Sequence, residues 1–183
     1  MAVLVVTPPD PLVSLNDAKE HLRVRHYEED GLIELYLKAA TSWVDGPKGW
    51  LGRSIGQQVL EVKGTAFGEI CTLPFGPVIE IVSATYIDEA GAAQTLPADV
   101  YELHDDTLAL APDQSWPATR GRRGDAVVRY KAGYPAVPEA VQQAVLLLVG
   151  QWYRNRMAIN VGNFVNELPF GVEALLAPYR KFG

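Results

Sequence analysis

Hydrophobic residues recur at helical spacing in a first segment near the amino terminus, SLNDAKEHLR. Leu15, Ala18 and Leu22 lie at intervals of three and four residues, as on one face of a helix. Ser14 stands directly before them and is a favourable N-cap residue, because its hydroxyl can accept a hydrogen bond from the first turn. The pattern predicts a short helix over about residues 15–24.

A second helical pattern follows in EDGLIELYLKAATSWV, where Leu32, Tyr36, Ala39 or Ala40, and Trp43 recur at helical spacing. Acidic residues stand at its beginning, where the helix dipole favours negative charge. The sequence DGP follows Val44 and is typical of a helix end. We therefore predict a second, longer helix that packs against the first.

From about residue 54 to 131 the pattern changes to short runs of β-branched residues separated by Gly, Pro and Asp. The runs that predict strands are QVLEVKG, EICTLP, VIEIVSATYID, AAQTLP, VYELHD, TLALAP and AVVRYKAG. Their close spacing predicts an antiparallel meander or a small barrel. Residues 1–13, apolar and then proline-rich, predict an extended arm or a first short strand.

Helical periodicity returns near the carboxyl end, with a helix predicted from about 138 to 157 and a short one at about 170–177. The longer helix has two apolar stripes that together span roughly 200° of its circumference. The first stripe is Val141, Ala144, Val145, Leu148 and Trp152, and the second is Leu146, Val149 and Tyr153. So wide an arc contacts neighbours on two sides, either both within the chain or one of them in an adjacent subunit.

The order helix, helix, strands, helix, helix predicts an α+β fold, because no alternation of strands and helices is present. The expected architecture is a small helical bundle formed by the N- and C-terminal helices, with the β segment inserted between them. The predicted divisions are residues 1–53 for the arm and helical hairpin, 54–132 for the inserted β subdomain, and 133–183 for the helices that complete the bundle.

Composition and charge narrow the function. The 183 residues are 48% hydrophobic and carry a net charge of −6, whereas proteins that mainly grip DNA are usually basic. No apolar run approaches the roughly 20 residues of a membrane span, so we expect no membrane contact. Cys71 is the single cysteine and cannot form an internal disulfide, which is typical of folding in a reducing cytoplasm.

Motifs that carry chemistry are missing from the sequence. It has no phosphate-binding glycine loop, no dinucleotide fingerprint, no nucleophile elbow and no pair of metal-binding cysteines. His21 and His26 are five residues apart, which does not place two ligands on one helical face. We therefore expect no catalytic residue, no metal site, no cofactor and no enzymatic activity.

Basic residues gather in three places in this acidic chain: Arg120, Arg122 and Arg123 in a predicted loop, Arg154 and Arg156 at the end of the long helix, and Arg180 with Lys181 near the carboxyl terminus. Cations at a helix end have an electrostatic explanation. That explanation does not account for Trp152 and Tyr153, the aromatic pair directly before Arg154. Trp, Tyr and Arg are the residue types enriched in interface hot spots.

Five segments, in this order, make the chain resemble the phage head-tail connector (adaptor) family, in particular the group with a β insertion found in phages and prophages. These segments are TPPDPLVSLNDAKEHLRV, EEDGLIELYLKAATSWV, WPATRGRRGDAVVRYKAGY, PEAVQQAVLLLVGQWYRNR and ELPFGVEALLAPYR. The resemblance covers nearly the whole chain, and the last two segments are its most specific part.

This resemblance implies a structural protein of the virion that is assembled in the host cytoplasm and located at the head–tail interface. Members form a ring, usually dodecameric, beneath the portal protein, extend the DNA channel, and present a surface to a tail-side completion or stopper protein. Packaged DNA is expected to pass without specific binding, and an acidic wall suits that passage.

Three sets of contact residues follow from the resemblance together with the patterns above. The predicted subunit interface is Leu146, Val149, Trp152, Tyr153, Arg154 and Arg156. The predicted portal-docking set is Leu168, Phe170, Leu175, Leu176, Tyr179, Arg180 and Phe182. Arg120, Arg122 and Arg123 are predicted to form a loop that faces the tail side or the DNA. Two other functions stay open, a DNA-binding packaging accessory that uses this loop and a tail-completion protein.

Overall fold

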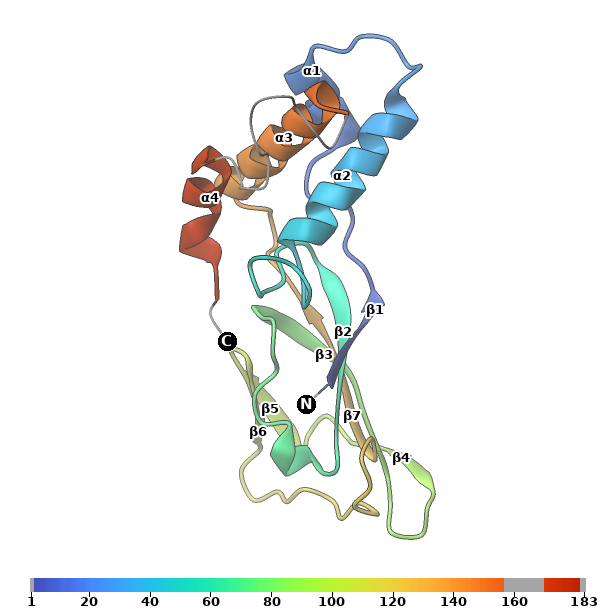
Figure 1. Ribbon diagram of the computed structural model, residues 1–183. Coiled ribbons are helices and arrows are strands. Elements are labelled where there is room, and N and C mark those ends of the chain that lie inside the picture. Colours follow the sequence, from blue (N-terminus) through green and yellow to red (C-terminus); the bar gives the residue numbers. More distant parts are fainter. Residues whose placement is uncertain (1, 157–169, 182–183) are drawn as a thin grey trace. The chain divides into compact units, whose positions relative to one another are not determined.

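The computed structural model describes residues 2–156 and 170–181 and confirms an α+β fold (Figure 1). The chain divides into two compact units. A β unit comprises Met1–Pro9 and Gln57–Tyr134, and a helical unit comprises Asp10–Gly56 and Pro135–Gly183. The division differs from the predicted one chiefly at the start of the chain, because the first nine residues belong to the β unit and not to the helical hairpin.

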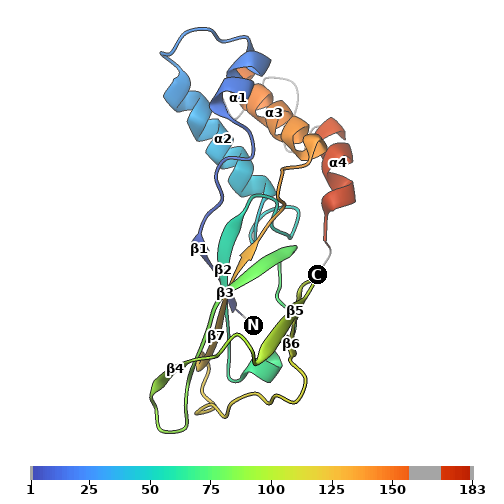
Figure 2. The same cartoon turned by 180° about the vertical axis from the view of Figure 1, so that it is seen from behind.

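Among its described residues the helical unit has four helices, and each lies where the periodicity predicted one. They are α1 (Leu15–Leu22), α2 (Asp30–Val44), α3 (Glu139–Arg154) and α4 (Phe170–Leu176), followed by the 3₁₀ turn η2 (Ala177–Tyr179). Helix α3 contacts α1, α2 and α4 (Figures 1 and 2). It is thus the central helix of this unit.

Helix α1 begins and ends with local hydrogen bonds. The Ser14 hydroxyl oxygen accepts from the backbone N–H of Asp17 at 3.1 Å, which satisfies one of the free donors of the first turn. At the other end Arg23 has a φ of 60°, and the Arg23 and Val24 amides donate to carbonyls of the last turn. This left-handed residue ends the helix two residues before the predicted position.

The buried stripe of α2 differs from the predicted one. Ile33, Leu37, Ala40 and Val44 are each 0–1% exposed. Of these only Ala40 was in the predicted stripe, whose residues Leu32, Tyr36 and Trp43 are half-buried. The large aromatic side chains had suggested the wrong face, because aliphatic residues fill the close-packed side of the helix.

The segment between α2 and the β unit is fixed by one buried carboxylate. Asp45 is 7% exposed, and its side chain accepts hydrogen bonds from the amides of Ile55 at 2.6 Å and Gly56 at 3.0 Å. Because a buried carboxylate is costly unless it is hydrogen-bonded, these two bonds hold residues 45–56 in a closed loop.

The β unit contains a five-stranded antiparallel sheet with the order β1-β2-β7-β3-β4 and a separate β5–β6 hairpin. Its strands are β1 (Ala2–Thr7), β2 (Gln58–Gly64), β3 (Val78–Ile87), β4 (Ala93–Thr95), β5 (Tyr101–His104), β6 (Thr107–Leu110) and β7 (Ala126–Ala132). Since β7 lies between β2 and β3, the sheet is not the simple meander, which was one of the two predicted arrangements.

The prediction of a strand over EICTLP is wrong. This segment begins with Glu69, the last residue of the 3₁₀ turn η1 (Phe67–Glu69), and among the described residues it makes a single β-bridge, from Thr72 to Thr107. Ile70 and Leu73 are both fully buried while the two residues between them are exposed. A spacing of three cannot place both side chains on one face of a strand, where the period is two.

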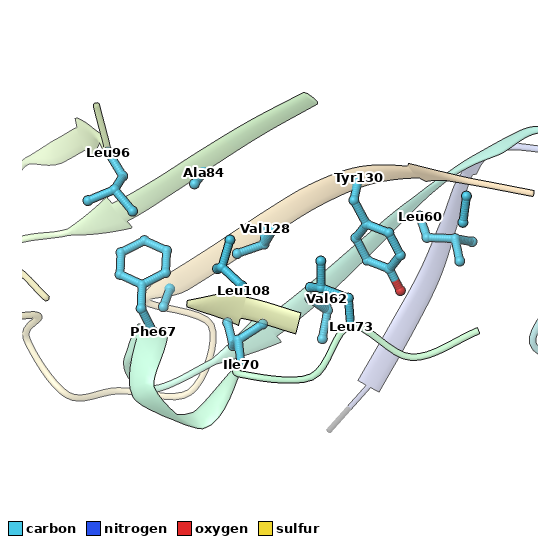
Figure 3. Close-up of a cluster of buried hydrophobic side chains, with 12 residues drawn as sticks. Leu60, Val62, Phe67, Ile70, Leu73, Ala84, Leu96, Leu108, Val128 and Tyr130 are labelled. Carbon is cyan, nitrogen blue, oxygen red and sulfur yellow. The ribbon is translucent and has the colours of Figure 1, made fainter. Parts of the chain in front are cut away.

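The core of the β unit lies between one face of the sheet and a cover made by η1, the segment after it and the β5–β6 hairpin (Figure 3). Leu60, Val128 and Tyr130 come from the sheet, and Leu108 comes from β6. The Tyr130 hydroxyl donates to the Pro74 carbonyl at 2.6 Å, so its polar end is satisfied in the core, where burial raises the tyrosine pKa.

Within residues 2–156 and 170–181, no helix is both long enough and apolar enough to cross a membrane.

Candidate interaction surfaces

The carboxyl end of α3 is joined to the start of α2 through Glu29. The Tyr153 hydroxyl donates to one carboxylate oxygen of Glu29, and an Arg156 guanidinium nitrogen donates to the other at 2.5 Å. The Arg156 guanidinium also lies 5.1 Å from the centre of the Tyr153 ring. These bonds lower the pKa of Glu29, with the Tyr153 bond as the larger cause, and they raise the pKa of Tyr153.

The predicted subunit interface on α3 is therefore used largely within the chain. Val149 is 0% exposed and is a core residue, so its assignment to an intermolecular contact is corrected. Trp152 is half-buried with its ring 6.4 Å from that of Tyr36 in α2. Leu146 is half-buried and Arg154 is exposed, so these two remain the best placed for a contact with another molecule.

The predicted portal-docking set is also partly internal. Leu176 is 0% exposed, as is Val172 on the same helix, so Leu176 packs within its own unit and cannot serve as a docking residue. Leu175 and Tyr179 are half-buried and Arg180 is exposed. Phe170 is the first residue of α4, and Leu168 and Phe182 lie outside the described residues.

The segment after α4 is attached to the loop that follows α2. The Lys181 amide donates to the Leu51 carbonyl at 2.9 Å. The Arg180 guanidinium lies 4.2 Å from the centre of the Trp50 ring, which stacks on Trp43 at 6.1 Å and 16°. Arg180 is thus engaged in a cation–π contact, and the carboxyl-terminal segment has a defined place in the helical unit.

The basic loop divides into one internal arginine and two exposed ones. Arg120 forms an ion pair with Asp125, from Nη2 to Oδ1 at 2.8 Å, and the other oxygen of Asp125 accepts from the Arg122 amide at 2.7 Å. The bond from Arg120 is the main reason why the pKa of Asp125 is lowered. Arg120 therefore closes the loop, while Arg122 and Arg123 are exposed and remain available to a partner.

One charged surface was missed by the sequence analysis, on the face of the sheet turned away from the core. Glu61 on β2 is 4% exposed, and it accepts from Arg129 Nε at 2.5 Å and lies 3.0 Å from Lys63 Nζ. Burial alone would raise the pKa of Glu61, but the bonds from Arg129 and Lys63 outweigh it and lower the pKa. The alternation of polar residues in QVLEVKG and AVVRYKA was the signal for this face.

The described residues were also compared with the side-chain groupings that bind metal ions. Within residues 2–156 and 170–181, no three His, Cys, Asp or Glu side chains are grouped so that they could hold a metal ion. The described side chains offer charge, hydrogen bonds and apolar area, which are the means of protein–protein contact.

Solved structures resemble this chain over its whole length. A chain in the neck of an empty gene transfer agent particle, computed with C6 symmetry, and a chain in the virion of the native particle are both 25% identical to it, with a TM-score of 0.76. Each match covers 100% of this chain and 97% of the other. A chain in the neck of the native particle, computed with C12 symmetry, is 24% identical with a TM-score of 0.73, over the same shares of both chains, and shares the fold.

No curated protein matches the sequence. The family model described as "Head completion protein" matches residues 11–182, which include all of the helical unit's described elements and most of the β unit. The resemblance to head–tail connector proteins is thereby confirmed, and the chain belongs to the head completion protein family.

Proposed function

We propose that this protein is a structural component of a tailed phage or phage-like particle, where it forms a ring at the head–tail interface beneath the portal. The ring extends the DNA channel and provides the attachment surface for a tail or stopper protein. The observation that carries the proposal is the match to the head completion family over residues 11–182, joined by full-length likeness to chains from a gene transfer agent neck and virion.

The expected partners are the portal protein on one side, a tail-side completion or stopper protein on the other, and further copies of the same chain. The C6 and C12 symmetries printed for the two related necks support a ring with a multiple of six subunits, and we propose a dodecamer. Rings of this kind require heterologous contacts, in which two different surfaces of each subunit meet.

The net charge of −6 supports a channel through which DNA passes without being held. Binding of a protein to DNA depends mainly on Lys and Arg that neutralise phosphates and release counterions. A ring of acidic subunits repels the duplex over the Debye length of about 8 Å at physiological salt. Packaged DNA can therefore slide when it leaves the head.

Portal docking is proposed for the carboxyl-terminal segment, now without the buried Leu176. Leu175 and Tyr179 are half-buried and Arg180 is exposed. These residues, with Leu168, Phe170 and Phe182, supply apolar and basic groups at one end of the chain, and such groups are typical of interface cores.

Deletion of the gene in a producing host tests the proposal. We expect heads that package DNA but carry no tails, and complementation by the wild-type gene to restore tailed particles. A cryo-EM map of complemented particles should show the chain in a ring at the neck. Normal tailed particles from the deletion host, or purified particles that lack the chain, would contradict the proposal.

A DNA-binding packaging accessory is the second candidate, and exposed Arg122 and Arg123 are the observation in its favour. It predicts retardation of DNA fragments in a gel at low salt, with an affinity that falls steeply as salt rises. Absence of retardation at low salt dismisses this candidate. A tail-completion protein, the third reading, differs only in which surface meets which partner.

A further inference from the structure

Charge is unevenly distributed in the β unit. Residues 64–119 contain nine Asp or Glu and neither Lys nor Arg. All six Lys and Arg of the unit lie on β2, on β7 or in the loop that enters β7, and Arg120 among them is paired with Asp125. The other five, which we name the basic strip, are Lys63, Arg122, Arg123, Arg129 and Lys131.

The basic strip lies on the face of the sheet turned away from the core and on the loop beside it. Arg129 pairs with Glu61 across β2 and β7, and Lys131 pairs with Glu80 across β7 and β3; paired residues share a face of the sheet. Lys63 and Arg129 are 48% and 50% exposed. The face carries two carboxylates against three of these cations, and the adjoining loop adds the other two cations, so an excess of positive charge remains.

The opposite side of the β unit is acidic. Tyr101 and Leu103 of β5 pack against the core, so Glu102 between them points away from it and is 47% exposed. Further exposed carboxylates stand at the ends and at the turn of the β5–β6 hairpin. The set that we name the acidic hairpin face is Asp99, Glu102, Asp105 and Asp113.

These two surfaces lie on opposite sides of one folded unit, because the hairpin covers the core face of the sheet and the basic strip lies on its other face (Figures 1 and 3). Exposed apolar side chains accompany the basic strip. Leu4, which pairs with Glu61 and so shares its face, is 57% exposed, and Val82 on β3 is 53% exposed. Apolar groups beside complementary charges are the composition of a protein–protein interface.

We propose that the basic strip of one copy docks on the acidic hairpin face of the next copy, so that the β units form the lateral contact of the ring. This inference rests on the proposed ring function and specifies its contact. Opposite charges on opposite sides allow each subunit to bind two neighbours in a head-to-tail manner, as a closed ring requires. They also disfavour contacts between two like faces, because juxtaposed like charges are repulsive.

Charge reversal on each surface tests the contact. Arg122→Glu/Arg123→Glu reverses part of the basic strip, Asp99→Lys/Glu102→Lys reverses part of the acidic hairpin face, and a fourfold variant combines them. All four residues are exposed, so folding should be retained, and thermal unfolding of the purified proteins checks this. The readouts are copies of the chain per purified particle and the yield of tailed particles from a host that lacks the native gene.

We expect each twofold variant to lower both readouts by at least about tenfold, a modest loss of contact free energy, and the fourfold variant to recover most of the loss. Glu89→Lys/Glu20→Lys is the matched control for the variant of the acidic hairpin face, because it makes the same change of charge at exposed residues outside both surfaces. The control should assemble like the wild type.

Three other outcomes would contradict the proposed contact, and each has a different meaning. Normal assembly of both twofold variants removes the lateral contact but leaves the head–tail role intact. Loss in both without recovery in the fourfold variant shows that these faces do not meet. If only the arginine variant fails and it also loses salt-sensitive retention of DNA, the loop binds DNA instead. Failure of the proposed function is a different result, namely complete particles in which the wild-type chain is absent.

Discussion

Glu29 is the residue at which two distant helix ends meet. Its carboxylate accepts hydrogen bonds from Tyr153 and Arg156 at the end of α3 while it stands directly before α2. The bonds stabilise the ionised carboxylate and therefore lower its pKa in the folded chain. A group of this kind links the stability of the protein to pH.

Glu29→Gln is predicted to destabilise the protein at neutral pH and to be nearly neutral in acid. The folded pKa of Glu29 is lowered, so its stabilising contribution is complete above the unfolded pKa of about 4.3. The contribution is lost as the pH falls through the lower folded value. Denaturant unfolding of both proteins between pH 7 and pH 3 should show the difference in unfolding free energy shrinking toward zero.

Glu28→Gln is the matched control, since Glu28 is exposed and precedes Glu29 by one residue; it should follow the wild type across the whole range. A difference between wild type and Glu29→Gln that is the same at pH 7 and pH 3 would show that the charge of Glu29 is not what stabilises the α2–α3 junction.

Sequence reasoning at this scale found the right residues and gave them the wrong partners. Acids before α2 and arginines after α3 each have a sufficient local explanation in the helix dipole. The pairing of Glu29 with Arg156 spans 127 residues, and no local pattern contains that information. Tyr153 and Arg156 were therefore assigned to a neighbouring subunit, although their first partner lies in the same chain.

At the scale of elements, helix positions were predictable and helix faces were less so. Capping by Ser14 and the periodicity of α3 depend on neighbouring residues, and both are as predicted. The buried face of α2 depends on what packs against it. The sequence pattern predicted the face with Tyr36 and Trp43, whereas the face with Ile33 and Leu37 is the buried one. The strand prediction for the segment around Cys71 was wrong for a related reason, because the apolar residues of this segment cover a core without joining a sheet.

Helix α4 provides the prediction that belongs to this scale. Leu176→Ala should lower the unfolding free energy by about 2–5 kcal/mol, the usual cost of truncating a fully buried leucine. Glu173→Ala, at an exposed position of the same helix, should change it by less than about 0.5 kcal/mol. Denaturant unfolding of the two variants measures both effects.

The same pair of variants separates packing from docking. If Leu176 were a portal contact, its truncation would leave the isolated chain as stable as the wild type and weaken only the attachment to heads. A stable Leu176→Ala protein would therefore restore the original docking assignment, which the burial of Leu176 in its own unit contradicts.

At the scale of the whole molecule, the insertion of a β unit between two helical pairs was visible in the change of composition after residue 54. The place of the first strand was not, because β1 pairs with β2 across the fifty residues of helix and loop between Thr7 and Gln58. Non-local strand pairing leaves no signal in either strand alone. Each unit is consequently built from two separate segments of the chain, which makes the independence of the two units a property that can be tested.

Excision of the β unit is predicted to leave a folded helical unit. Gln57 Nε2 lies 3.5 Å from the Tyr134 carbonyl oxygen, so a linker of a few Gly and Ser residues can join residues 56 and 135 once residues 1–9 and 57–134 are removed. Helices α1, α2 and α4 all contact α3, and their buried residues supply a core that needs no strand. Circular dichroism should show a helical protein with cooperative thermal unfolding, and the same excision carrying Leu176→Ala should unfold at a lower temperature. A disordered excised chain would mean that the helices depend on the β unit for their fold.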